Sequence, residues 1–74
     1  MTLADLPTGQ RRLISAIEAE NDNQYRLNQL GVIPGCTVEV LRVAPLGDPL
    51  QIRIDNTLLS IRRQDAGSIL VQQA

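Results

Sequence analysis

The sequence has no histidine, lysine, tryptophan or phenylalanine, and it has one cysteine, Cys36. Histidine is the commonest general base and the commonest transition-metal ligand, so its absence argues against most enzymes and most transition-metal sites. One cysteine excludes an intrachain disulfide and a zinc site made of several thiolates. Without lysine there is no Walker-type phosphate loop, and without histidine no base can activate Cys36 or a serine. The composition therefore predicts a protein that is not an enzyme and holds no cofactor.

Net charge and aromatic side chains are also scarce. Seven arginines stand against eight carboxylates, giving a net charge of −1, and Tyr25 is the only aromatic residue. Domains that bind nucleic acids normally present a basic face, and those that bind single strands add stacking aromatics. The sequence therefore argues against a nucleic-acid partner. Arginine without lysine suits protein–protein contacts, because the planar guanidinium stacks and pairs with two atoms of a carboxylate.

The chain also lacks a long apolar run and a secretory signal. No stretch approaches the roughly 20 apolar residues needed to cross a bilayer, and the first residues have no basic start before an apolar segment. A length of 74 residues predicts one domain, residues 1–74, with a small core of leucine, isoleucine, valine and alanine. We therefore expect a single soluble domain in the cytoplasm.

Alternating apolar and polar residues predict five short strands, at residues 11–18, 37–44, 50–55, 57–63 and 68–72. Asp55 and Asn56 form a suitable two-residue hairpin turn, because both residue types tolerate positive φ. Strands of this length with tight connections predict a mainly β protein, a small antiparallel barrel whose closure removes exposed edges. The residues expected to face inward are Val38, Val40, Leu50, Ile52, Ile54, Leu59, Ile61 and Ile69.

One short α-helix and one helical turn interrupt this pattern. Asn21, Asp22 and Asn23 are good N-cap residues, and Gly31 suits the left-handed residue that follows a helix. Leu27 and Leu30 lie three residues apart, so we expect both to pack this helix on the sheet. Residues 63–68 predict a single C-terminal helical turn, and the Pro34-Gly35 pair predicts a type II turn.

The segment "PLGDP" places an apolar side chain in a stiff loop. It consists of Pro45, Leu46, Gly47, Asp48 and Pro49. The two prolines restrict the loop before any partner arrives, Gly47 permits a positive φ, and Asp48 can hydrogen-bond to the loop's own backbone. Two interpretations stay open: Leu46 folds inward and covers one end of the barrel, or it projects as an anchor for a protein partner.

Other charged residues permit sharper hypotheses beside ordinary ones. Glu18, Glu20 and Asp22 could gather a hard cation, although we favour solvated carboxylates with Asp22 capping the helix. Arg62 or Arg63 could act in trans as an arginine finger on a partner nucleotidase, or could be a surface residue whose stem covers the barrel. We retain Arg62, with the loop at residues 45–49, as an expected partner contact.

Three segments of the sequence, "LGVIPG", "VAPLGDPLQIRI" and "LLSIRRQDAGSILV", closely resemble the ferrous iron transport protein A (FeoA) family. The resemblance covers residues 27–71 in the expected order. It implies an SH3-like β-barrel and a small cytosolic, non-enzymatic component of bacterial ferrous iron uptake. It further implies contact with the membrane transporter FeoB and its GTP-binding domain, which would recruit the protein to the inner face of the membrane. A ferrous-iron chaperone or sensor, and a GTPase-activating protein, remain the alternatives.

Overall fold

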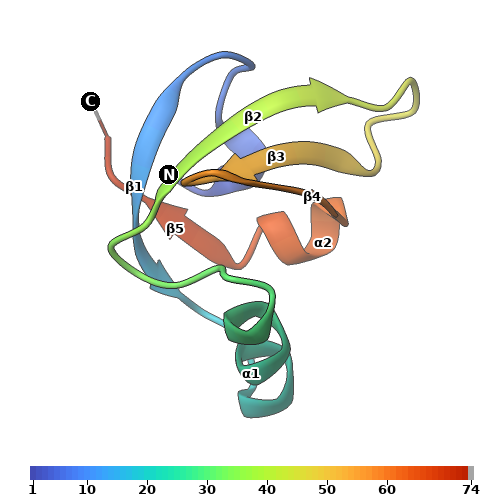
Figure 1. Ribbon diagram of the computed structural model, residues 1–74. Coiled ribbons are helices and arrows are strands. Elements are labelled where there is room, and N and C mark those ends of the chain that lie inside the picture. The colour runs from blue at the N-terminus through green and yellow to red at the C-terminus, as the bar shows by residue number, and fades with distance from the viewer. Residues whose placement is uncertain (74) are drawn as a thin grey trace.

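A bent antiparallel sheet of five strands forms the body of the protein (Figure 1). The computed structural model describes residues 1–73. Its elements, in chain order, are the 3-10 helix η1 (Leu3–Asp5), β1 (Arg11–Ile17), α1 (Asn21–Gln29), β2 (Thr37–Val43), β3 (Leu50–Ile54), β4 (Thr57–Ile61), α2 (Arg63–Ala66) and β5 (Ile69–Val71). The five predicted strands and both helical segments are therefore confirmed, with ends that differ by one or two residues.

The sheet is open, with the strand order β4-β3-β2-β1-β5. The predicted closure of all edges is wrong, because α2 lies in the chain between β4 and β5 and these two strands do not pair. The β5 edge is partly covered by the N-terminal residues, where the Val71 amide donates to the Met1 carbonyl at 3.0 Å. The register shift between Val40 and Arg42 gives β2 the irregularity that lets a small sheet bend sharply.

The apolar residues of the inner face form one continuous core. Seven of the eight residues predicted to face inward are buried, whereas Leu59 is only partly buried at the edge strand β4. Two leucines of the N-terminal segment, Leu3 and Leu6, also enter this core. Regular alternation on β2 and β3 explains why the inward face could be read correctly from the sequence.

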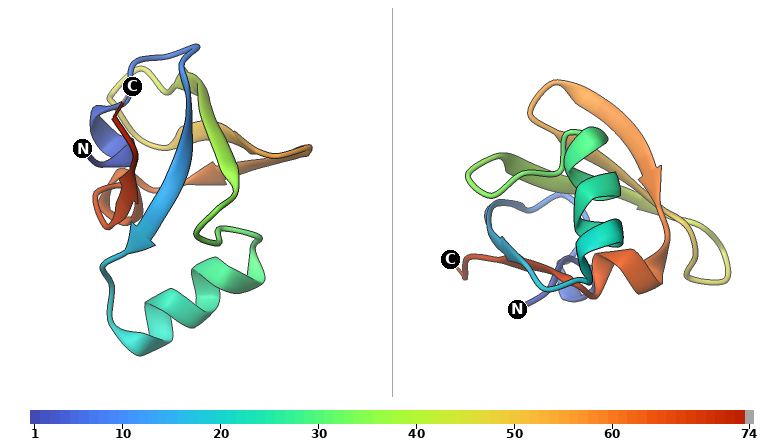
Figure 2. Two further views of the ribbon diagram at one scale, coloured as in Figure 1. Left: turned by 90° about the vertical axis from the view of Figure 1, so that its left-hand side faces the viewer. Right: turned by 90° about the horizontal axis from the view of Figure 1, so that it is seen from below.

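Helix α1 lies across one end of the sheet, away from the strands' faces (Figure 2). Leu27 is fully buried, but Leu30 is 44% exposed, so the expectation that both leucines pack on the sheet is wrong for Leu30. The reason is that Leu30 is the C-cap, where the chain leaves the helix through Gly31 at a φ of 95°. Val32, directly after that turn, supplies the second buried side chain.

The start of α1 also differs from the prediction. The N-cap is Glu20, one residue before the three residues expected there, and its side chain makes no capping hydrogen bond. Asp22 therefore lies in the first turn, where a carboxylate still interacts favourably with the helix dipole. The hairpin turn between β3 and β4 forms as expected, although only Asp55, at a φ of 50°, uses the left-handed region.

None of the helices among residues 1–73 is long and apolar enough to cross a membrane.

Candidate docking site

The loop between β2 and β3 forms a short, closed projection from one end of the sheet. Val43 pairs with Leu50 at its base, and the Ala44 amide donates to the Pro49 carbonyl at 3.0 Å. Within the loop the Gly47 amide donates to the Ala44 carbonyl at 2.7 Å, and Gly47 adopts the expected positive φ of 87°. These bonds and the two prolines fix the loop backbone before any partner binds.

Leu46 lies at the tip of this loop, and 97% of its surface is exposed. The loop can be followed in Figure 1 as the yellow connection beyond the end of β2. Of the two interpretations that the sequence left open, the inward-folded leucine is therefore wrong. Folding removes almost none of the apolar surface of Leu46 from water, so this surface remains available for a contact.

Arg63 holds the loop against the rest of the molecule. Its guanidinium Nε donates to the Gly47 carbonyl at 2.7 Å, and its Nη1 donates to the Ala4 carbonyl at 3.3 Å. Its backbone amide donates to Asp48 Oδ1 at 3.1 Å. Asp48 therefore accepts from α2, and the predicted bond to the loop's own backbone is wrong. Sequence reasoning missed this role of Arg63, because its acceptors lie 16 and 59 positions away.

Arg62 has a different environment from its neighbour. It is the exposed N-cap of α2, and within residues 1–73 its side chain makes no hydrogen bond or ion pair. Because Leu50 pairs with Ile61, the loop and the start of α2 lie at the same end of β3 and β4. The structure thus brings Arg62 and the loop at residues 45–49 to neighbouring positions.

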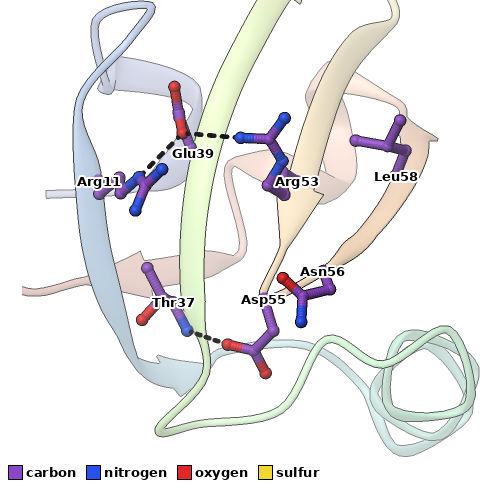
Figure 3. Close-up of a pocket in the computed structure, with 7 residues that line it drawn as sticks. All are labelled: Arg11, Thr37, Glu39, Arg53, Asp55, Asn56 and Leu58. Atoms are coloured by element: carbon purple, nitrogen blue, oxygen red, sulfur yellow. Dashed lines mark hydrogen bonds and ion pairs between the residues drawn. The ribbon is translucent and has the colours of Figure 1, made fainter.

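A shallow pocket of about 630 Å³ lies on the outer face of the sheet (Figure 3). Glu39 Oε1 accepts from Arg11 Nε at 3.1 Å and lies 3.6 Å from Arg53 Nη1. Asp55 Oδ1 accepts from the Thr37 amide at 3.1 Å. The two arginines and two carboxylates compensate one another, and exposed pairs of this kind contribute little to stability. The ion pairs in this pocket therefore link β1, β2 and β3, and the pocket offers no unmatched charge to a ligand.

The carboxylates considered for a cation do not converge. Glu20 and Asp22 line one shallow surface hollow together with Asn21, and Glu18 is not part of it. Across the described residues 1–73, no three side chains of the metal-binding types lie close enough to hold an ion. The structure therefore provides no preformed metal site in this part of the chain.

Cys36 is partly buried beside the β3–β4 hairpin. Burial raises the pKa of the Cys36 thiol, and the nearby Asp55 carboxylate raises this pKa further. Since the thiolate is the form that reacts and binds metals, both effects oppose a reactive or metal-binding role.

The bent five-stranded sheet, its short helices and the exposed loop between β2 and β3 define a small, mainly β domain. The profile of the FeoA domain family matches residues 1–73. The chain belongs to the FeoA family, so the resemblance drawn from residues 27–71 is confirmed. This family is associated with ferrous iron transport.

Known relatives agree with this assignment. The chain is 36% identical over 72 residues to the Fe(2+) transport protein A/Fe(2+) transporter FeoB fusion protein of Porphyromonas gingivalis. That match covers 97% of this chain but only 8% of the fusion protein, so the chain spans a small part of that relative's length.

Solved structures confirm the fold. The solution structure of the FeoA protein from Chlorobium tepidum superposes with a TM-score of 0.88 at 39% identity, over 96% of this chain and 68% of that one. The zinc-complexed FeoA of Stenotrophomonas maltophilia, described as a prokaryotic SH3 domain protein, gives a TM-score of 0.83 at 28% identity, over 97% and 89% of the two chains. The predicted SH3-like fold is thereby confirmed.

Proposed function

We propose that this protein is a cytosolic accessory protein of ferrous iron uptake and acts by binding the transporter FeoB on its cytosolic side. The observation that carries the proposal is Leu46, which is 97% exposed at the tip of a loop fixed by two prolines and by Arg63. A preformed loop loses little entropy on docking, so most of the energy of burying Leu46 would appear as affinity. We include Pro45, Gly47, Asp48 and Pro49 in the contact as the frame that presents the leucine.

The fused relative supports the choice of partner. In the Porphyromonas gingivalis protein a segment similar to this chain and a FeoB transporter belong to one polypeptide. Covalent linkage keeps two parts at a high effective concentration, which favours their contact even when the separate affinity is weak. The loop at residues 45–49 is the surface that we propose for this contact.

A pull-down tests this proposal. The immobilised protein is offered the cytosolic GTP-binding portion of FeoB from the same organism, without nucleotide and with GDP or a GTP analogue. We expect the wild type to retain FeoB in at least one of these states and Leu46→Ser to lose most of it. Leu58→Ser is the matched control, because Leu58 is also an exposed leucine, at 65%, but lies on the outer face of β4. Failure of the wild type to retain FeoB in every nucleotide state would overturn the proposal.

The alternative of a GTPase-activating protein narrows to one residue. Arg63 Nε and Nη1 already donate to the Gly47 and Ala4 carbonyls, so of these two adjacent arginines Arg62 is the one whose side chain could reach a partner's nucleotide. An arginine finger accelerates hydrolysis by about 10³-fold or more, which is far above the effect of simple binding. Measuring GTP hydrolysis by FeoB with wild type and Arg62→Ala separates this alternative from a docking role.

A further inference from the structure

A pocket of about 300 Å³ opens between α1, the end of β4 and α2. It is separate from the pocket on the outer face, and it is bounded on one side by the helix that lies across the end of the sheet. Its lining residues are Arg26, Leu30, Ser60, Ile61, Arg62 and Asp65. The pocket therefore lies between the two helices, next to the end of the molecule that carries the loop at residues 45–49.

The charges in this pocket do not balance. Arg26 Nη2 donates to Asp65 Oδ2 at 2.8 Å, and the Asp65 side chain is only 15% exposed, so this carboxylate is already committed to Arg26. Arg62 has no carboxylate partner within residues 1–73. The pocket thus carries one net positive charge in a chain whose net charge is −1. In the outer-face pocket, by contrast, two arginines meet two carboxylates.

The apolar wall of the pocket narrows the choice of ligand. Leu30 is 44% exposed and stands beside the unmatched arginine, so the pocket offers a cation next to an aliphatic surface. A dianionic phosphate would meet only one net positive charge and would also face Asp65. A carboxylate with a single negative charge matches the pocket's charge, and its own methylene groups or an apolar neighbour match Leu30.

We infer that this pocket receives an aspartate or glutamate side chain of the protein partner, with the carboxylate paired to Arg62 and an apolar group packed on Leu30. The planar guanidinium can bind both oxygens of such a carboxylate. Arg26 is 49% exposed despite its bond to Asp65, so it presents a second positive group at the rim. The inference rests on the proposed function, because it describes a second point of contact in the same complex as Leu46.

Arg62→Gln tests the inference, with Arg11→Gln as the matched control. Both changes remove one positive charge from an exposed side chain, but Arg11 lies on the outer face of β1, paired with Glu39. Affinity for the cytosolic portion of FeoB is measured by calorimetry, and the unfolding of each variant checks the fold. We expect Arg62→Gln to weaken binding about tenfold or more and Arg11→Gln less than about twofold. Arg62→Lys should recover part of the loss, since it restores the charge without the two-pronged geometry.

Salt and nuclear magnetic resonance provide independent readouts. Raising the salt concentration should weaken binding of the wild type more than binding of Arg62→Gln, because the variant lacks the screened ion pair. On adding FeoB, the amide signals of Leu30, Arg62 and Asp65 should shift, whereas that of Arg11 should stay in place. Equal affinities of Arg62→Gln and Arg11→Gln would overturn this inference and leave docking through Leu46 intact. Absence of any binding by the wild type would instead overturn the proposed function, and this inference with it.

Discussion

Arg62 and Arg63 are adjacent in the sequence, but their side chains lie in different environments. Arg63 donates to the Gly47 and Ala4 carbonyls, while Arg62 faces a pocket and has no partner within residues 1–73. Nothing local distinguishes the two, because the acceptors of Arg63 come from distant parts of the chain. The sequence could therefore nominate the pair but could not divide the roles between them.

Arg63→Ala should lower the free energy of unfolding by about 1 kcal/mol, because it removes two hydrogen bonds from a charged donor at the surface. Arg62→Ala should change it by less than about 0.5 kcal/mol, as expected for a surface side chain without partners. Urea denaturation of both variants measures the difference. The Gly47 amide should also exchange faster in Arg63→Ala, since the loop loses its attachment to α2. Equal effects of the two substitutions would contradict the role assigned to Arg63.

Cys36 gives a prediction that depends on pH. Because burial and the Asp55 carboxylate raise the pKa of the Cys36 thiol, the reactive thiolate should form at a higher pH than in an unperturbed cysteine. The rate of maleimide labelling should therefore reach half its maximum at a higher pH in the folded protein than in urea. Asp55→Asn should move that midpoint downward, since it removes a negative charge and keeps the shape of the turn. An unchanged midpoint would show that Asp55 has no effect on the thiol.

At the scale of secondary structure, the strands were easier to predict than the helix. One face of β2 and β3 is buried, so a period of two residues marks the inward positions directly. Helix α1 has only nine residues, and Leu30, the second leucine of the expected pair, lies just after its last residue. A spacing of three residues cannot show whether the second leucine lies before or after the point where the helix ends. The sequence pattern also could not show whether the edge strands β4 and β5 pair with each other, because that pairing depends on contacts between distant segments.

The two leucines of α1 should therefore differ in their contribution to stability. Leu27→Ala removes a fully buried side chain and should cost about 2–4 kcal/mol, whereas Leu30→Ala at a 44% exposed C-cap should cost less than about 1 kcal/mol. A short helix of this kind depends on its packing, so α1 should also lose amide protection in Leu27→Ala. Chemical denaturation with hydrogen exchange measures both effects. A cost at Leu30 equal to that at Leu27 would restore the original expectation of two packing leucines.

At the scale of the whole molecule, the distribution of carboxylates bears on iron. Residues 1–73 contain no group of three side chains suited to hold a metal ion. We expect the isolated protein to bind ferrous iron with an affinity weaker than micromolar, because isolated carboxylates and a protonated thiol are poor ligands for it. Anaerobic calorimetry with ferrous iron measures this directly. A stoichiometric site of micromolar affinity or better would revive the chaperone and sensor alternatives.

The geometry of the loop at residues 45–49 was predicted in part. The prolines and Gly47 indicated a stiff loop, because these residue types restrict or permit particular φ values wherever they stand. The direction of Leu46 did not follow from the sequence, since a loop has no periodicity to show which side faces the core. The hydrogen bonds within the loop and those that Arg63 makes to Gly47 and Asp48 hold the loop in a position that leaves the leucine exposed. The pocket beside Arg62 was missed entirely, because it forms between α1, β4 and α2.

Leu46→Ala, with unfolding and FeoB affinity measured on the same preparation, tests the central claim most directly. A leucine that is 97% exposed contributes nothing to the core, so the free energy of unfolding should stay within about 0.5 kcal/mol of the wild type. Affinity for the cytosolic portion of FeoB should fall by at least ~2 kcal/mol, which is about thirtyfold, as expected when an anchor at the centre of an interface is truncated. A loss of several kcal/mol in stability, with unchanged affinity of the folded fraction, would contradict the claim.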